Sequence, residues 1–79
     1  MAYLTQCVRG GSSDKRTGYT LKFWYDAQVV EALKSAVPHT EREWRETTTE
    51  WWVSEAYTEQ LKKLFSNFEA LIFRQEKLL

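Results

Sequence analysis

The chain has 79 residues, of which 43% are hydrophobic and 15% aromatic, and its formal net charge at pH 7 is zero. This length predicts one domain, and the hydrophobic content excludes a disordered tail. The neutral balance also lacks the strongly basic character of a typical protein that binds duplex DNA.

The cysteine content and hydropathy pattern indicate a cytoplasmic location. The single cysteine, Cys7, excludes an internal disulfide and a cysteine-based zinc site, and it suits a reducing compartment. No stretch approaches the roughly 18 apolar residues of a membrane helix, so we expect no membrane partner. The first nine residues lack a basic region followed by an apolar core, so we expect no signal peptide.

Charge is unevenly distributed along the chain. Residues 1–25 carry four cations against one acid, whereas residues 26–60 carry eight acids against three cations. This pattern leaves room for a local basic patch near the N-terminus and makes the middle of the chain acidic.

The first quarter of the chain predicts a strand that follows a loop. Residues 3–8 have mixed strand character, and residues 9–18 contain all three glycines, which predicts a flexible loop. Residues 19–25 alternate in hydrophobicity and are rich in strand-forming types. The set expected to face the core is Tyr19, Leu21, Phe23 and Tyr25.

A helix is predicted over residues 27–36. Asp26 is a suitable N-cap, because its carboxylate can accept a hydrogen bond from a free backbone N–H of the first turn. Apolar residues then recur at helical spacing, and Pro38 forces the helix to end near Ala36 or Val37.

Residues 42–53 predict a β-hairpin rich in tryptophan. Its turn, residues 46–50, lacks glycine and Asn-Gly, which favours a loop longer than two residues. With Trp44 and Trp51 facing inward, the period of two directs Trp52 outward.

The C-terminal third predicts a second helix and a tail. Ser54 is a candidate N-cap, and the helix should end at Ser66-Asn67. The tail, residues 69–79, suits either a short strand or another helix, and we favour the strand. The apolar stripe of the helix is Tyr57, Leu61, Leu64, Phe65 and Phe68.

These elements predict an α+β fold with two layers. The expected order is strand, helix, strand, strand, helix and, in addition, a C-terminal strand. Two helices would cover one face of a small, mostly antiparallel sheet of three or four strands.

Part of the chain resembles a known family. The stretch 23–34, which runs from a strand through Tyr-Asp into a helix, is similar to the opening of the HARP domain, the accessory module of annealing helicases. Trp44, the run 51–54 and Tyr57 stand where that pattern has a tryptophan-bearing hairpin and the start of a helix. The resemblance covers residues 19–65.

The resemblance implies a strand-helix-hairpin-helix fold and contact with branched or single-stranded DNA. The chain departs from the family pattern at two positions. Ser54 stands where the family often has proline, and Glu50 stands where it usually has lysine or arginine.

No arrangement of residues predicts catalysis, a cofactor or a metal site. His39 lies in a Pro-His-Thr segment typical of a surface turn, and Cys7 is the only other soft ligand. Glu41 and Glu43 lie among arginines, so we expect charge pairs rather than acid–base chemistry. The chain therefore predicts a binding module and not an enzyme.

The candidate binding surface is the sheet face that the helices leave uncovered. Two tryptophans and two cations on that face would form a stacking platform for unpaired bases, with two more cations of the loop contacting phosphates. Two alternatives stand beside the platform: burial of the face in a homodimer or other protein interface, and cover by the first strand or the tail. The residues concerned are Lys22, Trp24, Arg45 and Trp52, with Lys15 and Arg16 in the loop.

Overall fold

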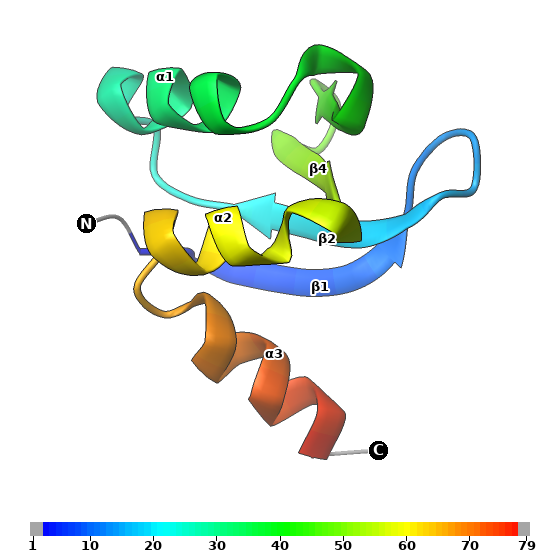
Figure 1. Ribbon diagram of the computed structural model, residues 1–79, viewed down its shortest axis with the longest axis vertical. Helices are drawn as coiled ribbons and strands as arrows, with labels where there is room; N and C mark the ends of the chain where they lie inside the picture. Colours follow the sequence, from blue (N-terminus) through cyan, green and yellow to red (C-terminus); the bar gives the residue numbers. More distant parts are fainter. Residues whose placement is uncertain (1–2, 78–79) are drawn as a thin grey trace.

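The computed structural model describes residues 3–77, with side chains through residue 72 (Figure 1). It shows a small α+β domain in which helices cover one face of a four-stranded antiparallel sheet, as predicted. The elements in chain order are β1 (Gln6–Gly11), β2 (Thr17–Lys22), α1 (Ala27–Ala36), the 3₁₀ turn η1 (His39–Glu41), β3 (Arg42–Arg45), β4 (Glu50–Ser54), the 3₁₀ turn η2 (Glu55–Tyr57), α2 (Thr58–Leu64) and α3 (Phe68–Lys77).

The sheet has the strand order β1-β2-β4-β3, and every neighbouring pair is antiparallel. The register places Tyr19 opposite Val53 and Leu21 opposite Trp51. Because side chains opposite each other share a face, these four point to the helical layer. Thr20 and its partner Trp52 point to the other face, which we call the outer face.

The hydrophobic core lies between the sheet and the helices. In the helical layer α2 lies between α1 and α3 (Figure 1). Among the residues 3–77, no helix is long and apolar enough to cross a membrane. The side chains at the centre of the core are fully or almost fully buried: Tyr19, Leu21, Leu33, Val37, Val53, Leu61, Phe65 and Phe68.

The predicted helix over residues 27–36 is confirmed at both ends. The side chain of Asp26 accepts a hydrogen bond from the backbone N–H of Gln28 at 2.9 Å, which caps the first turn. The helix stops before Val37 and Pro38. The hairpin is also confirmed, with a turn of four residues, 46–49, between β3 and β4.

The prediction of a loop over residues 9–18 was wrong in part, because half of these residues are paired strand. Gly10 lies opposite Gly18 and Gly11 opposite Thr17, so only residues 12–16 form the β1–β2 turn. The order therefore begins with two strands rather than one. All three glycines are therefore strand residues and not loop residues.

The strand predicted over residues 19–25 ends early, at Lys22. Tyr25, expected in the core, is 81% exposed, and Phe23 is half-buried against the core. The chain leaves the sheet here because α1 begins directly after Asp26. The alternation of apolar residues continued for three positions beyond the backbone pairing.

The strand favoured for the tail was wrong, because residues 68–77 form α3. Phe68 is buried against Tyr19, with ring centroids 4.9 Å apart in an edge-on arrangement. The side chain of Asn67 holds the backbone of Leu4 by two hydrogen bonds, of 2.8 and 2.9 Å. These contacts fix the start of α3 against β2 and the N-terminal segment. Residues 78–79 of the predicted tail lie outside the described residues.

Trp52 points outward as predicted, but it is fully buried. Its indole lies over Gly18 of β2 and donates a hydrogen bond from Nε1 to the carbonyl oxygen of Gly10 on β1 at 3.1 Å. Because Gly10 and Gly18 are paired on this face, the two strands leave a slot without side chains. The indole fills that slot.

The slot predicts a sharp difference between two glycine substitutions. A Cβ at Gly18 would lie 2.7 Å from the Trp52 ring and closer still to the carbonyl oxygen of Val53. We expect Gly18→Ala to lower the free energy of unfolding by about 3 kcal/mol or to prevent folding. Gly10→Ala is the matched control, because its Cβ would meet only Thr20 Oγ1 at 3.8 Å. Urea denaturation followed by circular dichroism measures both, and equal stability of the two variants would contradict the slot.

Candidate functional site

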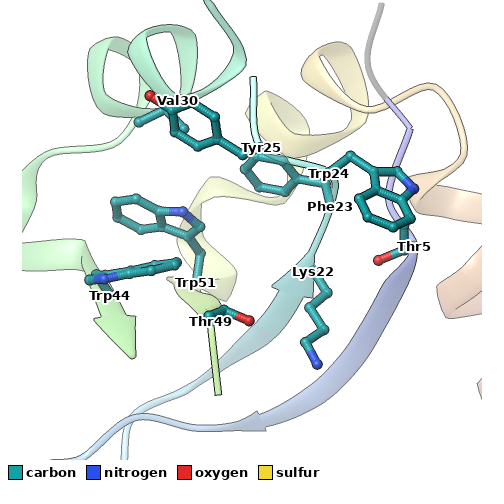
Figure 2. A pocket seen from close by; sticks show the side chains of 9 residues that line it. All are labelled: Thr5, Lys22, Phe23, Trp24, Tyr25, Val30, Trp44, Thr49 and Trp51. Atoms are coloured by element: carbon teal, nitrogen blue, oxygen red, sulfur yellow. The ribbon is translucent and has the colours of Figure 1, made fainter. Parts of the chain in front are cut away.

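Aromatic side chains gather around a groove of about 570 Å³ at the end of the sheet where β2 stops (Figure 2). They come from the connection between β2 and α1 and from the β3–β4 hairpin. Five of the nine lining residues are aromatic. The lining consists of Thr5, Lys22, Phe23, Trp24, Tyr25, Val30, Trp44, Thr49 and Trp51.

The connection between β2 and α1 exposes two of these rings. Residues 23–26 have no strand partner, and the capped start of α1 follows at once. Trp24 is 84% exposed, whereas Phe23 packs on Phe65 of the core with ring centroids 5.3 Å apart. Phe23 therefore anchors the segment, and its neighbours Trp24 and Tyr25 are left at the surface.

The other wall of the groove is a pair of tryptophans. Trp44 on β3 and Trp51 on β4 lie opposite each other, with ring centroids 5.1 Å apart and planes tilted by 46°. Trp51 is half-buried against the core. Trp44 is 49% exposed because β3 is the edge strand and no further strand covers it.

The groove has one charged group in its lining, Lys22 at its rim (Figure 2). No carboxylate lines it. Lys22 has no ion pair among the residues that the structure describes. Such a lining suits a flat apolar group that carries negative charge, because rings stack on rings and the ammonium complements an anion.

Trp24 also borders a second, shallower groove. This groove has a volume of about 520 Å³ and runs between the N-terminal segment, α1 and α2, with Tyr3 and Lys63 in its lining. Unlike the first groove it contains a carboxylate, Asp26, which caps α1. Trp24 therefore lines both grooves.

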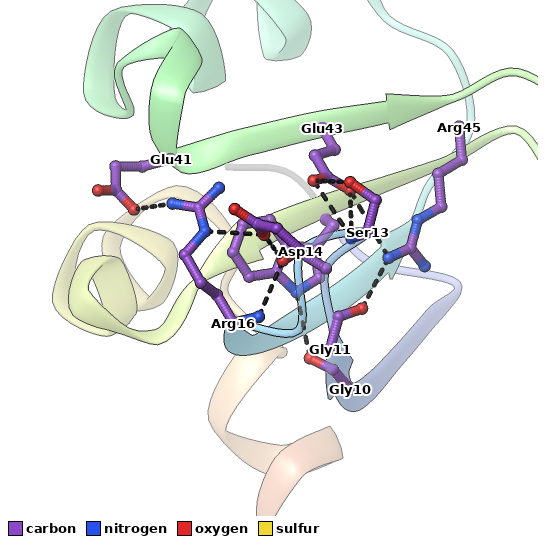
Figure 3. Close-up of polar contacts among 10 residues, drawn as sticks. Gly10, Gly11, Ser13, Asp14, Arg16, Glu41, Glu43 and Arg45 are labelled. Carbon is purple, nitrogen blue, oxygen red and sulfur yellow. Dashed lines mark hydrogen bonds and ion pairs between the residues drawn. The ribbon is translucent and has the colours of Figure 1, made fainter.

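The part of the outer face around Trp52, which was predicted as the binding surface, is covered by the β1–β2 turn (Figure 3), whereas Val8 on β1 stays 39% exposed. The guanidinium of Arg16 lies over the Trp52 ring, 5.1 Å from its centroid. The same guanidinium contacts Asp14 and Glu41, each at 3.0 Å. The hydrogen bond to Asp14 raises the pKa of Arg16, and hydrogen bonds from Ser12 and then Arg16 lower the pKa of Asp14.

Two side chains of β3 hold the same turn in place. The carboxylate of Glu43 accepts hydrogen bonds from the backbone N–H and hydroxyl of Ser13, the latter at 2.8 Å. Arg45 donates to the carbonyl oxygen of Gly11 at 2.8 Å and lies 3.9 Å from Glu43. The arginine therefore neutralises a carboxylate within the protein and ties β3 to β1.

The predicted site residues thus separate into two places. Lys22 and Trp24 both line the aromatic groove, whereas Arg16, Arg45 and Trp52 lie in the covered part of the outer face. Lys15 is exposed in the turn, with a positive φ of 66°. The outer face was expected to be a stacking platform, a protein interface, or a surface covered by the first strand or the tail. The structure shows that Trp52 is covered. The β1–β2 turn and Gly10 cover it, rather than the whole first strand or the tail.

Sequence reasoning assigned three residues of the groove wrongly or only in part. Tyr25 was placed in the core, and Trp44 and Trp51 were expected to be hidden on the inner face. Trp44 and Trp51 do share the inner face, but Trp51 is only half-buried and Trp44, on the edge strand, is 49% exposed. The Asp26 cap signal, directly after the aromatic run 23–25, marked the point by which strand alternation had to stop.

Other reactive groups do not form a site. Burial raises the pKa of the Cys7 thiol to about 12, which suppresses the reactive thiolate. His39 is exposed at the start of η1. Within the described part of the chain, no three His, Cys, Asp or Glu side chains are grouped to hold a metal ion.

No family model, curated protein or solved structure matches this chain. The similarity to the HARP domain stays a prediction.

The contrast between two tryptophans on neighbouring elements gives a direct test of these assignments. We expect Trp52→Ala to lower the free energy of unfolding by about 3–5 kcal/mol, because it empties a filled slot. Trp24→Ala should change it by less than about 0.5 kcal/mol, because the ring is exposed. Urea denaturation measures both, and Trp52→Phe provides a milder variant if Trp52→Ala does not fold. A Trp24 variant less stable than the Trp52 variants would contradict the assignment.

Proposed function

We propose that the protein is a non-enzymatic binding module of the cytoplasm that holds unpaired bases of single-stranded nucleic acid in its aromatic groove. The observation that carries the proposal is the convergence of five aromatic rings and one ammonium in a single groove, where the described residues supply neither a carboxylate to the lining nor an ion pair to Lys22. The proposal keeps the predicted ligand and moves its site from the outer sheet face to the end of the sheet.

Base stacking supplies the main attraction in this proposal. Trp24 and Trp44 each present a ring with a large exposed area, and they stand on opposite sides of the groove. A base stacked on one aromatic ring gains about 1–3 kcal/mol, and any base offers a flat face. The bases of a duplex already stack on each other, so this groove favours unpaired segments or the open arms of a branched molecule.

Lys22 supplies the contact to the backbone. Its side chain starts in the groove lining and points away from the rings (Figure 2), so its ammonium would contact a phosphate of the strand after it leaves the stacked base. One phosphate contact on a single strand gives a slope of about −0.7 in the logarithm of affinity against the logarithm of salt. Because Arg16 and Arg45 are engaged within the protein, we expect this shallow dependence and not the steep one of a basic surface.

A partner protein is the second candidate, favoured by the area of exposed aromatic surface. Tyr3, Trp24 and Tyr25 are each at least 70% exposed, and Trp24 links the two grooves. Clustered aromatic residues are enriched at protein interfaces and dominate their binding energy. Binding of an apolar segment would not weaken with salt, and this property separates the two candidates.

The test is a titration of a fluorescently labelled oligothymidylate of eight nucleotides with the protein. Binding is followed by fluorescence anisotropy at low and moderate salt. Trp24→Ala should weaken binding about tenfold through the loss of one stacking ring. Lys22→Ala should weaken it severalfold and flatten the salt dependence. Lys34→Ala is the matched control, because Lys34 lies in the last turn of α1 and lines neither groove.

The proposal fails if the wild type binds no oligonucleotide at low salt. It also fails if Lys34→Ala weakens binding as much as Lys22→Ala, since the attraction would then depend on general charge. A duplex of the same length should bind more weakly than the single strand.

A further inference from the structure

The edge strand β3 has an open side. The strand order places β3 at the border of the sheet, with β4 on its inner side. Within residues 3–77, no segment other than β4 forms backbone hydrogen bonds with residues 42–45. The outward N–H and C=O groups of an edge strand can pair with another strand, which is a route to association.

The side chains of β3 and the next residue have a self-complementary order of charge. The sequence Arg42-Glu43-Trp44-Arg45-Glu46 reads as positive, negative, tryptophan, positive, negative. When a second copy runs antiparallel to it with Trp44 at the centre, every charge meets its opposite. The facing pairs are Arg42 with Glu46, Glu43 with Arg45, and Trp44 with Trp44 of the other copy.

Neighbouring registers lack this complementarity. Centring the pairing on Glu43 places two carboxylates opposite each other, and centring it on Arg45 places two guanidinium groups opposite each other. Like charges directly opposite across a strand pair are destabilising. A shift by one residue places outer-face side chains opposite inner-face ones, which would turn the second copy over and remove the two-fold symmetry. One register is therefore selected.

Of the residues needed for the pairing, Arg42, Trp44 and Glu46 are available in the single chain, whereas Glu43 and Arg45 also hold the β1–β2 turn. Arg42 and Glu46 have no ion pair among the described residues, and Arg42 Nε is buried without a hydrogen-bond partner. Trp44 is half exposed at the edge. Charged side chains on an edge strand usually prevent pairing. Here they oppose it only in the wrong registers.

We propose that two copies of this chain associate through β3 as a two-fold symmetric dimer with one continuous eight-stranded sheet. A two-fold axis perpendicular to the sheet keeps both helical layers on the same side. Because Trp44 lies at the axis and also lines the aromatic groove, the dimer brings the two grooves side by side. This inference does not depend on nucleic-acid binding.

The length of the edge sets the strength of the dimer. A strand of four residues, Arg42–Arg45, buries less than the roughly 1,200–2,000 Å² of a standard stable interface. We therefore expect a reversible dimer that dissociates on dilution, with the charge pairs choosing the register.

Charge reversal across the axis tests the proposal by sedimentation velocity over a range of protein concentrations, without nucleic acid. Arg42→Glu places two carboxylates opposite each other at both ends of the interface, and Glu46→Arg places two cations there. Each should raise the dimer dissociation constant about tenfold. The double variant should return to the wild-type value. An equal mixture of the two single variants should also dimerise, because each copy then meets opposite charges.

Lys34→Glu serves as the control, because it reverses a charge on the exposed face of α1, away from β3. Circular dichroism establishes that each variant is folded, and Glu46→Arg lies in an exposed turn where folding is not at risk. A wild type that is monomeric at all concentrations overturns the proposal. So does a dimer that the single reversals leave unchanged, or one that neither the double variant nor the mixture restores. Loss of oligonucleotide binding alone leaves these results unaffected and bears only on the proposed function.

Discussion

The burial of Trp52 on the outer face of the sheet determines where this protein can bind anything. The indole crosses β2 above Gly18 and reaches the Gly10 carbonyl oxygen on β1, so three of the four strands contribute to one contact. A full indole removed from water is among the largest single contributions that a 79-residue core can contain. The β1–β2 turn then closes over the ring through Arg16, and Trp52 is no longer available to a ligand.

The turn covers Trp52 and the helices cover the inner face, so the exposed aromatic rings are found at the ends and edges of the sheet. The aromatic residues beyond β2 and at the β3 edge lie at these places. Trp24 is exposed in this position, and the proposed binding role rests in part on that exposure. The groove and the β3 edge share Trp44, and this links the two proposals geometrically although each stands on its own contacts.

Local signals in the sequence predicted the elements well where one residue, such as a helix cap or a proline, constrains the backbone directly. Asp26 and Pro38 bounded α1 correctly, and the glycine-free turn indicated the longer hairpin loop. The direction of Trp52 also followed from alternation. Its burial did not, because the slot needs Gly10 and Gly18 to be paired, and that register joins residues from a segment that composition marks as loop. The tail was ambiguous for a similar reason: its helix is selected by contacts of Phe68 and Asn67 with distant residues.

Hydrogen exchange of the four tryptophan indole N–H groups, observed by heteronuclear NMR, tests the central claim most directly. Trp52 Nε1 is hydrogen-bonded and fully buried, so its proton should exchange far more slowly than that of Trp24, which is exposed in the connection before α1. Slow exchange at Trp52 together with fast exchange at Trp24 is the result that the structure predicts. Equally fast exchange at both would show that the outer face is open, and the binding surface would then have to be placed there instead.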